Sequence, residues 1–154
     1  MIKRCGSGAG YTMSAVIIDG KKTAAEIRGR IASRTAELKA GGVVPCLAVI
    51  LVGNDPASLS YVSAKRNALS EAGMNDRSVQ LPENTSEAEL LSLIGELNRD
   101  ESVHGILVQL PLPAGLAACE EEVLSRIDPR KDVDGFHPVN VGHLSIGAPG
   151  LRPC

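Results

Sequence analysis

Two continuous aliphatic runs constrain the fold of this chain more than any other feature. The first is CLAVILVG at residues 46–53, and the second lies within HGILVQLPLP at residues 104–113. Each run is too short for a helix and too apolar for a strand with one face in water, which indicates inner strands of a parallel sheet. Helical patterns lie between and after the two runs. The sequence therefore predicts an α/β fold, a three-layer αβα domain with a mainly parallel sheet.

Local patterns around these runs predict helices and weaker elements. Thr23 with Glu26, and Ser86 with Glu89, have the spacing of capping boxes at helix starts. The helix after Thr23 is expected to carry an apolar face, formed by Ile27, Ile31 and Leu38. Four further segments are expected: a strand or extended lead-in at residues 15–19, a strand at 75–82, a short helix at 119–127 and a loop-rich segment from residue 128 onward.

Residues 54–73 form the helix with the most unusual side chains. Asp55 before a proline is typical of a helix start, and Gly73 is typical of a helix end. At 100° per residue, Tyr61 and Lys65 fall on the apolar side of this helix. An ammonium group on a buried face costs free energy unless it reaches water along its own stem or has a partner or a chemical task. Both interpretations of Lys65 remain open on periodicity alone.

Two more candidates follow the second aliphatic run. Gln109 is a polar side chain inside GILVQL, where it makes either a structural hydrogen bond or a contact with a ligand. Asp134 belongs to an Asp-Gly pair, which is typical of a turn. In parallel sheets ligands bind beyond the carboxyl ends of the strands, and both residues are expected at that edge with the helix of residues 54–73.

Composition and motifs argue against several functional classes. There are 16 basic and 18 acidic residues, so we expect neither nucleic acid nor a membrane surface as a partner. Four widely spaced cysteines without a CxxC pattern are typical of reduced thiols in a cytoplasmic protein. Asp132 and Asp134 lack the other oxygens of a calcium loop, and the histidines have no metal-ligand spacing, so we expect no metal. No glycine-rich dinucleotide motif, phosphate loop or serine-hydrolase elbow is present.

Three segments of the chain together are similar to a known family. They read VGNDPASLSYVSAKRNALSEAG, HGILVQLPLP and KDVDGFHPVNVGHL. In this combination, from about residue 15 to residue 154, the chain resembles the N-terminal catalytic domain of bifunctional methylenetetrahydrofolate dehydrogenase/methenyltetrahydrofolate cyclohydrolase. The resemblance implies one-carbon metabolism, with oxidation of 5,10-methylenetetrahydrofolate by NADP and hydrolysis of the product to 10-formyltetrahydrofolate. It also implies a cytoplasmic location and a link to purine biosynthesis.

The resemblance assigns a role to each candidate residue. It implies three catalytic residues: Lys65 as the acid/base, Gln109 as the residue that supports this lysine, and Tyr61, which stacks on the aminobenzoate ring of the folate. Asp134 is expected to bind the pterin, and Ser58 is a further substrate-binding position beside Tyr61 and Gln109. Physical chemistry agrees with these roles, because a carboxylate can accept from two parallel donors of a pterin and a tyrosine ring offers a flat stacking face.

The resemblance also divides the chain. Residues 1–14 are expected to be a flexible extension, residues 15–144 the folate-binding catalytic domain, and residues 145–154 the start of an interdomain linker. In the family an NADP-binding Rossmann domain follows and holds most of the homodimer interface, so we expect no cofactor-binding residue in this chain. Two functions stay open: the truncated catalytic half of the enzyme, or a non-catalytic folate-binding or inactive fragment. Coding sequence for a strand, a glycine-rich turn and a helix beyond Cys154 would favour the first.

Overall fold

The central strand of the sheet, β1 (Cys46–Val52), has parallel partners along both of its edges. The computed structural model describes residues 18–150 and residue 153. In it, β2 (Asn75–Asp76) and β3 (Val79–Leu81) follow one another along one edge of β1, and β4 (Gly105–Val108) lies along the other. A parallel bridge between Ile106 and Asp132 adds the next segment of chain beyond β4. Because the described pairings are all parallel, the carboxyl ends of the strands share one edge.

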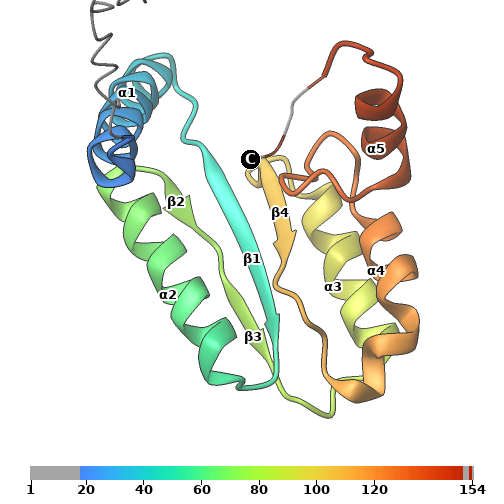
Figure 1. Ribbon diagram of the computed structural model, residues 1–154. Helices are drawn as coiled ribbons and strands as arrows, with labels where there is room; N and C mark the ends of the chain where they lie inside the picture. Colours follow the sequence, from blue (N-terminus) through green and yellow to red (C-terminus); the bar gives the residue numbers. More distant parts are fainter. Residues whose placement is uncertain (1–17, 151–152, 154) are drawn as a thin grey trace, which may run out of the picture.

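Helices cover both faces of this sheet (Figure 1). On one side lie α1 (Gly20–Ala40) and α2 (Pro56–Glu71), and on the other lie α3 (Glu87–Arg99) and α4 (Glu120–Arg126). A 3-10 helix, η1 (Ala114–Cys119), leads into α4, and α5 (Pro138–Ser145) follows it near the amino end of β4. The predicted three-layer α/β class is confirmed.

Side-chain alternation along β1 divides the apolar core into two layers. Ile50 packs on the α3 side with Leu90, whereas Leu51 packs on the α2 side with Val62 and with Leu107 of β4. Successive residues of a strand point to opposite faces, so a continuous aliphatic run fills both layers at once. As a result, β1 sets the position of α2 relative to β4, and these two elements carry the candidate site.

Local capping chemistry starts α2 and α3 where the sequence predicts. The Asp55 side chain accepts a hydrogen bond from the amide of Ser58, and Gly73 follows α2 with a φ of 71°. Ser86 and Glu89 make both hydrogen bonds of a capping box at the start of α3. The strand expected at residues 75–82 is present as the two short strands β2 and β3.

The predicted start of α1 is wrong. Asp19 caps the helix, and its side chain accepts from the amide of Lys22. Thr23 lies inside the first turn, where its hydroxyl donates to the Asp19 carbonyl, so Thr23 and Glu26 form no capping box. Aspartate is at least as good an N-cap as threonine, and its position four residues earlier lengthens the helix by a turn.

The apolar face expected on α1 is not buried by the described residues. Ile27 and Ile31 are 41% and 42% exposed, and Thr35 is the buried residue of this helix. The sheet lies under α2, and α1 reaches the domain mainly through α2, where Arg28 pairs with Glu71 at 3.6 Å. A periodic pattern predicts which side of a helix is apolar, but the neighbouring elements decide whether that side is covered.

The segment after Asp128 holds a helix that the sequence did not predict. The first turn of α5 is capped by His137, whose Nδ1 accepts from the amide of Val139. The glycines and prolines around this helix conceal its pattern. Residues 15–17 of the strand or extended lead-in expected at residues 15–19, and the extension expected at residues 1–14, lie outside the described residues. Ile18 and Asp19 belong to no strand. Within the described ranges, no helix has both the length and the apolar character needed to cross a membrane.

Candidate functional site

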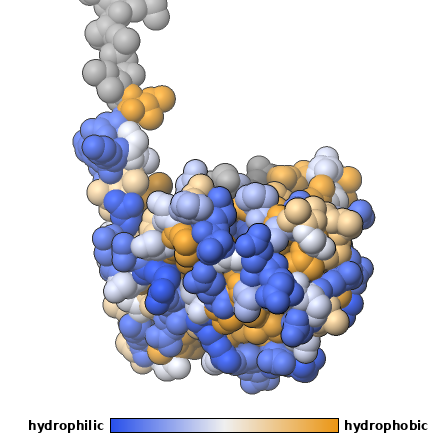
Figure 2. Space-filling view, turned by 90° about the horizontal axis from the view of Figure 1, so that it is seen from below, coloured by the Kyte–Doolittle hydropathy of each residue, from blue (hydrophilic) through white to orange (hydrophobic). Residues whose placement is uncertain are grey.

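Lys65 and Gln109 come into contact at the carboxyl edge of the sheet. The Nζ atom of Lys65 donates a hydrogen bond of 2.8 Å to Oε1 of Gln109. Gln109 follows Leu107 by two residues, so strand alternation directs it towards the face that α2 covers. Lys65 is partly buried on α2, one turn after Val62. Figure 2 looks onto this edge and shows hydrophilic side chains over much of it, with apolar patches between them.

Three hydrogen bonds fix the orientation of Gln109. Its backbone amide donates to the carbonyl of Ile50 at 2.8 Å, which continues the ladder between β4 and β1. Its side-chain amide donates to the carbonyl of Leu110 at 2.8 Å, and its side-chain oxygen accepts from Lys65. With the NH₂ group occupied by a carbonyl, the oxygen is the end that faces the lysine. Gln109 therefore receives a charged donor and holds it in one place.

Tyr61 lies beside this pair but is not buried. It is 62% exposed, and the centre of its ring is 5.9 Å from Nζ of Lys65. The expectation that Tyr61 shares the buried side of the helix is therefore wrong. The ring stands at the rim of α2, where it contributes a cation–π contact to the lysine and keeps most of its surface free. A free aromatic face beside an ammonium suits a flat ligand.

Asp134 stands apart from the other acidic residues of its loop because no described residue donates a hydrogen bond to it. Burial raises the pKa of its carboxyl, the nearby ammonium of Lys65 lowers it, and the Asp132 carboxylate raises it further, for a net rise. A partly buried carboxyl without donors is costly to ionise. The side chain is therefore available to a ligand that brings donors of its own.

Ser58 occupies the first turn of α2 and is 2% exposed. Its backbone amide donates to Oδ2 of Asp55 at 2.8 Å as part of the helix cap. This contact gives Ser58 a clear structural position at the start of the helix that carries Tyr61 and Lys65. Its expected contact with a substrate stays a prediction.

The loop that carries Asp134 approaches β4 closely. A Cβ atom at Gly105 would lie 2.7 Å from Cγ1 of Val133, so only glycine lets this segment pack against the strand. Lys131 anchors the loop on the other side, with Nζ donating to the carbonyls of Leu97, Asn98 and Asp100 at 3.0, 2.9 and 2.8 Å. These are carbonyls at the end of α3, where a cation is favoured. This role of Lys131 is not predicted from the sequence, because no local pattern shows which helix end a lysine reaches.

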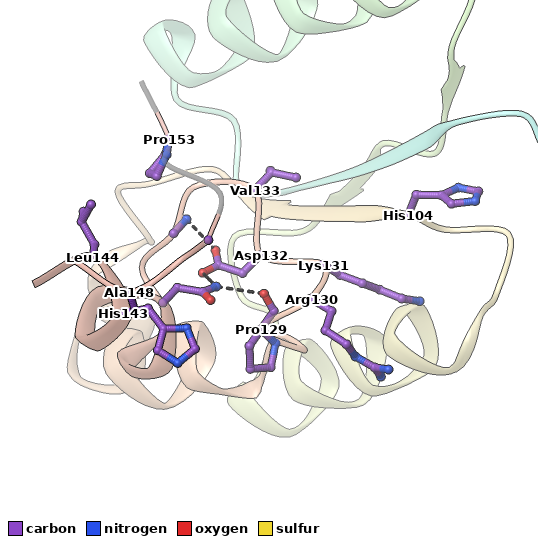
Figure 3. A pocket seen from close by; sticks show the side chains of 13 residues that line it. His104, Pro129, Arg130, Lys131, Asp132, Val133, His143, Leu144, Ala148 and Pro153 are labelled. Carbon is purple, nitrogen blue, oxygen red and sulfur yellow. Dashed lines mark hydrogen bonds between the residues drawn. The ribbon is translucent and has the colours of Figure 1, made fainter. Parts of the chain in front are cut away.

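Asp132 lies at the inside of the same loop (Figure 3). Its Oδ1 accepts from the amide of Gly135, and its Oδ2 accepts from the amide of His137 and the side chain of Asn140, each at 2.9 Å. Asp132, Val133 and Gly135 also line a hollow of about 500 Å³ between this loop and α5. Tyr61, Lys65, Gln109 and Asp134 do not line that hollow, so it is separate from the candidate site.

Neither a metal nor a dinucleotide has an evident place among the described residues. Within residues 18–150 and 153, no group of three His, Cys, Asp or Glu side chains is arranged to hold a metal ion. A dinucleotide pyrophosphate needs free amides at a helix start that follows a strand. At the starts of α2 and α3 the carboxylates of Asp55 and Glu89 already accept hydrogen bonds, and their charge would repel phosphate.

The fold and the site together define a class of protein: a parallel α/β domain with a lysine acid/base candidate, oriented by an amide, at the carboxyl edge of its sheet. The model of the tetrahydrofolate dehydrogenase/cyclohydrolase family, catalytic domain, matches residues 18–134. The chain belongs to this family.

Relatives and solved structures agree with this assignment. The chain is 58% identical over 141 residues to bifunctional protein FolD 1 of Rhizorhabdus wittichii. The matched region covers 91% of this chain and 47% of the relative. It is similar to the bifunctional enzyme FolD from Campylobacter jejuni, with a TM-score of 0.85, 49% identity, and coverage of 88% of this chain and 48% of the other. The Trypanosoma brucei enzyme, whose structure contains NADP cofactor and an inhibitor, gives a TM-score of 0.80, 39% identity and coverage of 86% and 44%. The chain spans about half the length of the relatives it matches.

Proposed function

We propose that this chain is the folate-binding half of an enzyme that oxidises 5,10-methylenetetrahydrofolate and hydrolyses the resulting methenyl compound to 10-formyltetrahydrofolate. The observation that carries the proposal is the hydrogen bond between Lys65 and Gln109, in a chain that belongs to the family named after these reactions. A lysine held by a glutamine oxygen at the ligand edge of a parallel sheet has the position required of an acid/base group.

Folate binding is assigned to the side chains around this pair. Asp134 accepts hydrogen bonds from the ring N–H and the amino group of the pterin, which supply the donors that the carboxylate lacks. Tyr61 stacks on the aminobenzoate ring with its exposed face. Gln109 completes the contact from the strand side, and Ser58 contributes from the first turn of α2. The site is thus built from α2, the segment that follows β4 and one loop.

The cyclohydrolase step requires only water and groups that move protons. A water oxygen bonds to the methenyl carbon of the cation, and the proton it loses passes to the neutral amine of Lys65. The bond between this carbon and N5 then breaks, and N5 takes a proton from the Lys65 ammonium. The hydroxyl group on the carbon gives its remaining proton to solvent water, so that a formyl group remains on N10 and one proton is released overall. Lys65 therefore ends the cycle as it began, and Gln109 keeps its amine directed at the reacting atoms.

NADP does not fit the described residues. The first turns of α2 and α3, where a pyrophosphate would bind, already hold the acidic side chains of Asp55 and Glu89. Hydride transfer is therefore not assigned to the described residues. The NADP cofactor, which the Trypanosoma brucei enzyme binds in its solved structure, is assigned to protein segments other than those described. A homodimer, which the family resemblance implies, is likewise assigned to those segments.

A cytoplasmic role in folate interconversion, in support of purine biosynthesis, agrees with two features. Cys46 and Cys119 are free thiols among the described residues, as is usual in a reducing compartment. The proposed product carries a formyl group that a formyl-transfer reaction consumes.

The proposal is tested by titrating the purified chain with 5-formyltetrahydrofolate in a calorimeter and by following the absorbance of methenyltetrahydrofolate in its presence. Saturable binding together with faster ring opening than in buffer supports the catalytic half-enzyme. Binding without faster ring opening supports the alternative, a non-catalytic folate-binding fragment. Absence of binding refutes both.

A further inference from the structure

Two aspartates of one loop, Asp132 and Asp134, are used in opposite ways. Both oxygens of Asp132 are occupied by donors of the chain itself, namely the amides of Gly135 and His137 and the side chain of Asn140. Asp134 receives no hydrogen bond from the described residues. A carboxylate with three donors is held in one orientation, whereas one without donors keeps its acceptor capacity for a ligand.

The bond from Gly135 to Asp132 closes a turn around Asp134. Gly135 has a φ of 70°, a conformation that glycine adopts without strain, and its amide points back to Oδ1 of Asp132 at 2.9 Å. Val133 and Asp134 are the two residues that lie between Asp132 and Gly135, which this hydrogen bond joins. Its backbone is therefore fixed on both sides, which sets the direction in which its carboxylate leaves the loop.

Asn140 connects this turn to the rest of the domain. Its Nδ2 atom donates to Oδ2 of Asp132 and to the carbonyl of Pro129, each at 2.9 Å. The first turn of α5 is therefore hydrogen-bonded to the loop at two residues. The backbone of the same loop pairs with β4, where the amide of Ile106 donates to the carbonyl of Lys131 at 2.7 Å. This strand leads directly to Gln109. The loop of Asp134 is thus fixed relative to β4, and β4 also positions Gln109, which orients Lys65.

We propose that Asp132 and Asn140 are positioning residues, which hold the turn of residues 132–135 so that the Asp134 carboxylate faces the ligand beside Lys65 and Gln109. This inference rests on the proposed function, since it adds two residues to the same folate site. Neither residue touches the ligand, because their polar atoms face the loop and α5.

The decisive variant is Asn140→Leu, which keeps the size of the side chain and leaves Asp132 in place. Calorimetric titration of the chain with 5-formyltetrahydrofolate is expected to give a dissociation constant about tenfold weaker, the lower end of what loss of an outer partner costs at metal sites. The matched control is Ser86→Ala, which removes the N-cap of α3, at the opposite end of this helix from the carbonyls that Lys131 of the loop reaches, and lowers stability without removing a bond to Asp132. Its affinity should equal that of the wild type.

A second readout needs no ligand. Carbon NMR of the Asp134 carboxyl follows its titration, and in Asn140→Leu the pKa should move down towards the ordinary aspartate value because a loosened turn admits water. Ser86→Ala should leave this titration unchanged. If Asn140→Leu does not fold, Asp132→Asn is measured instead. The side-chain oxygen of this asparagine can still accept a hydrogen bond within the turn, but its NH₂ group cannot accept the bonds that the second oxygen of Asp132 receives.

The two proposals fail separately. If the wild type does not bind 5-formyltetrahydrofolate, the proposed function is wrong, and the carboxyl titration still decides whether Asn140 and Asp132 position Asp134. If the wild type binds but a folded Asn140→Leu keeps both its affinity and its Asp134 titration, the positioning role is wrong and the proposed function stands.

Discussion

The ammonium of Lys65 and the side-chain oxygen of Gln109 lie 2.8 Å apart, although 44 positions separate the two residues in the chain. The first belongs to a helix on one face of the sheet and the second follows a strand in its plane. Their contact exists because Val62 and Leu107 pack in the same apolar layer and bring the two elements together. The ring of Tyr61, which is 62% exposed, lies beside the pair with its centre 5.9 Å from Nζ of Lys65.

Replacement of Lys65 by methionine should abolish proton transfer and leave the fold intact. Met keeps the length of the stem and removes the charge, so ring opening of methenyltetrahydrofolate should fall at least about a hundredfold or to the rate in buffer. Loss of methenyl absorbance measures the rate, and circular dichroism checks folding. Lys21→Met, at an exposed position of α1, is the control. Near wild-type ring opening by Lys65→Met would exclude this lysine as the acid/base.

Replacement of Asp134 by alanine should weaken binding more than chemistry. Two pterin donors would then be left without acceptors in the site, at a cost of about 1 to 3 kcal/mol. Calorimetry with 5-formyltetrahydrofolate should report a correspondingly weaker dissociation constant. An unchanged affinity would return Asp134 to the ordinary role of a turn residue.

The affinity for folate should depend on the ionisation of Asp134. In the proposed complex, the Asp134 carboxylate accepts from the pterin only when it is ionised. Burial raises the pKa of this carboxyl, the Lys65 ammonium opposes the rise and the Asp132 carboxylate adds to it. Affinity should therefore rise with pH through a pKa above the usual aspartate range. The free chain should behave in the opposite way, because the contribution of Asp134 to stability is largest below this range and is lost as pH rises through its folded-state pKa. Affinities of Asp134→Asn measured over the same pH range should lack the step, and a step that persists in this variant would assign it to another group.

The cap that Lys131 forms on α3 should contribute to stability. In Lys131→Met the last carbonyls of α3 lose a charged donor that reaches three of them, and the free energy of unfolding should fall by about 2 kcal/mol. Urea denaturation measures the change. Arg99→Met removes an exposed cation from the same helix end without removing these bonds, so it should change stability by less than about 0.5 kcal/mol. Equal losses in the two variants would mean that only the charge at this helix end matters.

Residues 1–154 on their own should not carry out the dehydrogenase reaction. Hydride transfer requires a nicotinamide held within a few ångströms of the methylene carbon, and the described helix starts are unsuited to its pyrophosphate. Methylenetetrahydrofolate and NADP are mixed with the purified chain, and the absorbance of NADPH is followed. Sustained NADPH formation that depends on the chain would contradict the prediction.

Local sequence determined the elements of the fold and the edge at which the site lies. The two aliphatic runs predict parallel inner strands because apolar side chains on both faces must be covered by helices. Asp55 and the pair of Ser86 and Glu89 start their helices because a cap is satisfied within one turn. Sequence motifs also indicated the family, and the resemblance implied that Gln109 supports Lys65, which agrees with the hydrogen bond between them.

Only the tertiary structure decided how these residues are used. Asp132 and Asp134 have the same side chain and stand two positions apart, yet Asn140 of α5 donates to the first, whereas no described residue donates to the second. Tyr61 belongs to the predicted apolar side of α2 but lies at its rim, where neighbouring elements leave its ring uncovered. The physical reason is the same in both cases. Periodicity and capping report interactions within a few residues, whereas burial and the donors of a buried carboxylate depend on chain segments that only the packing of the sheet and helices brings together.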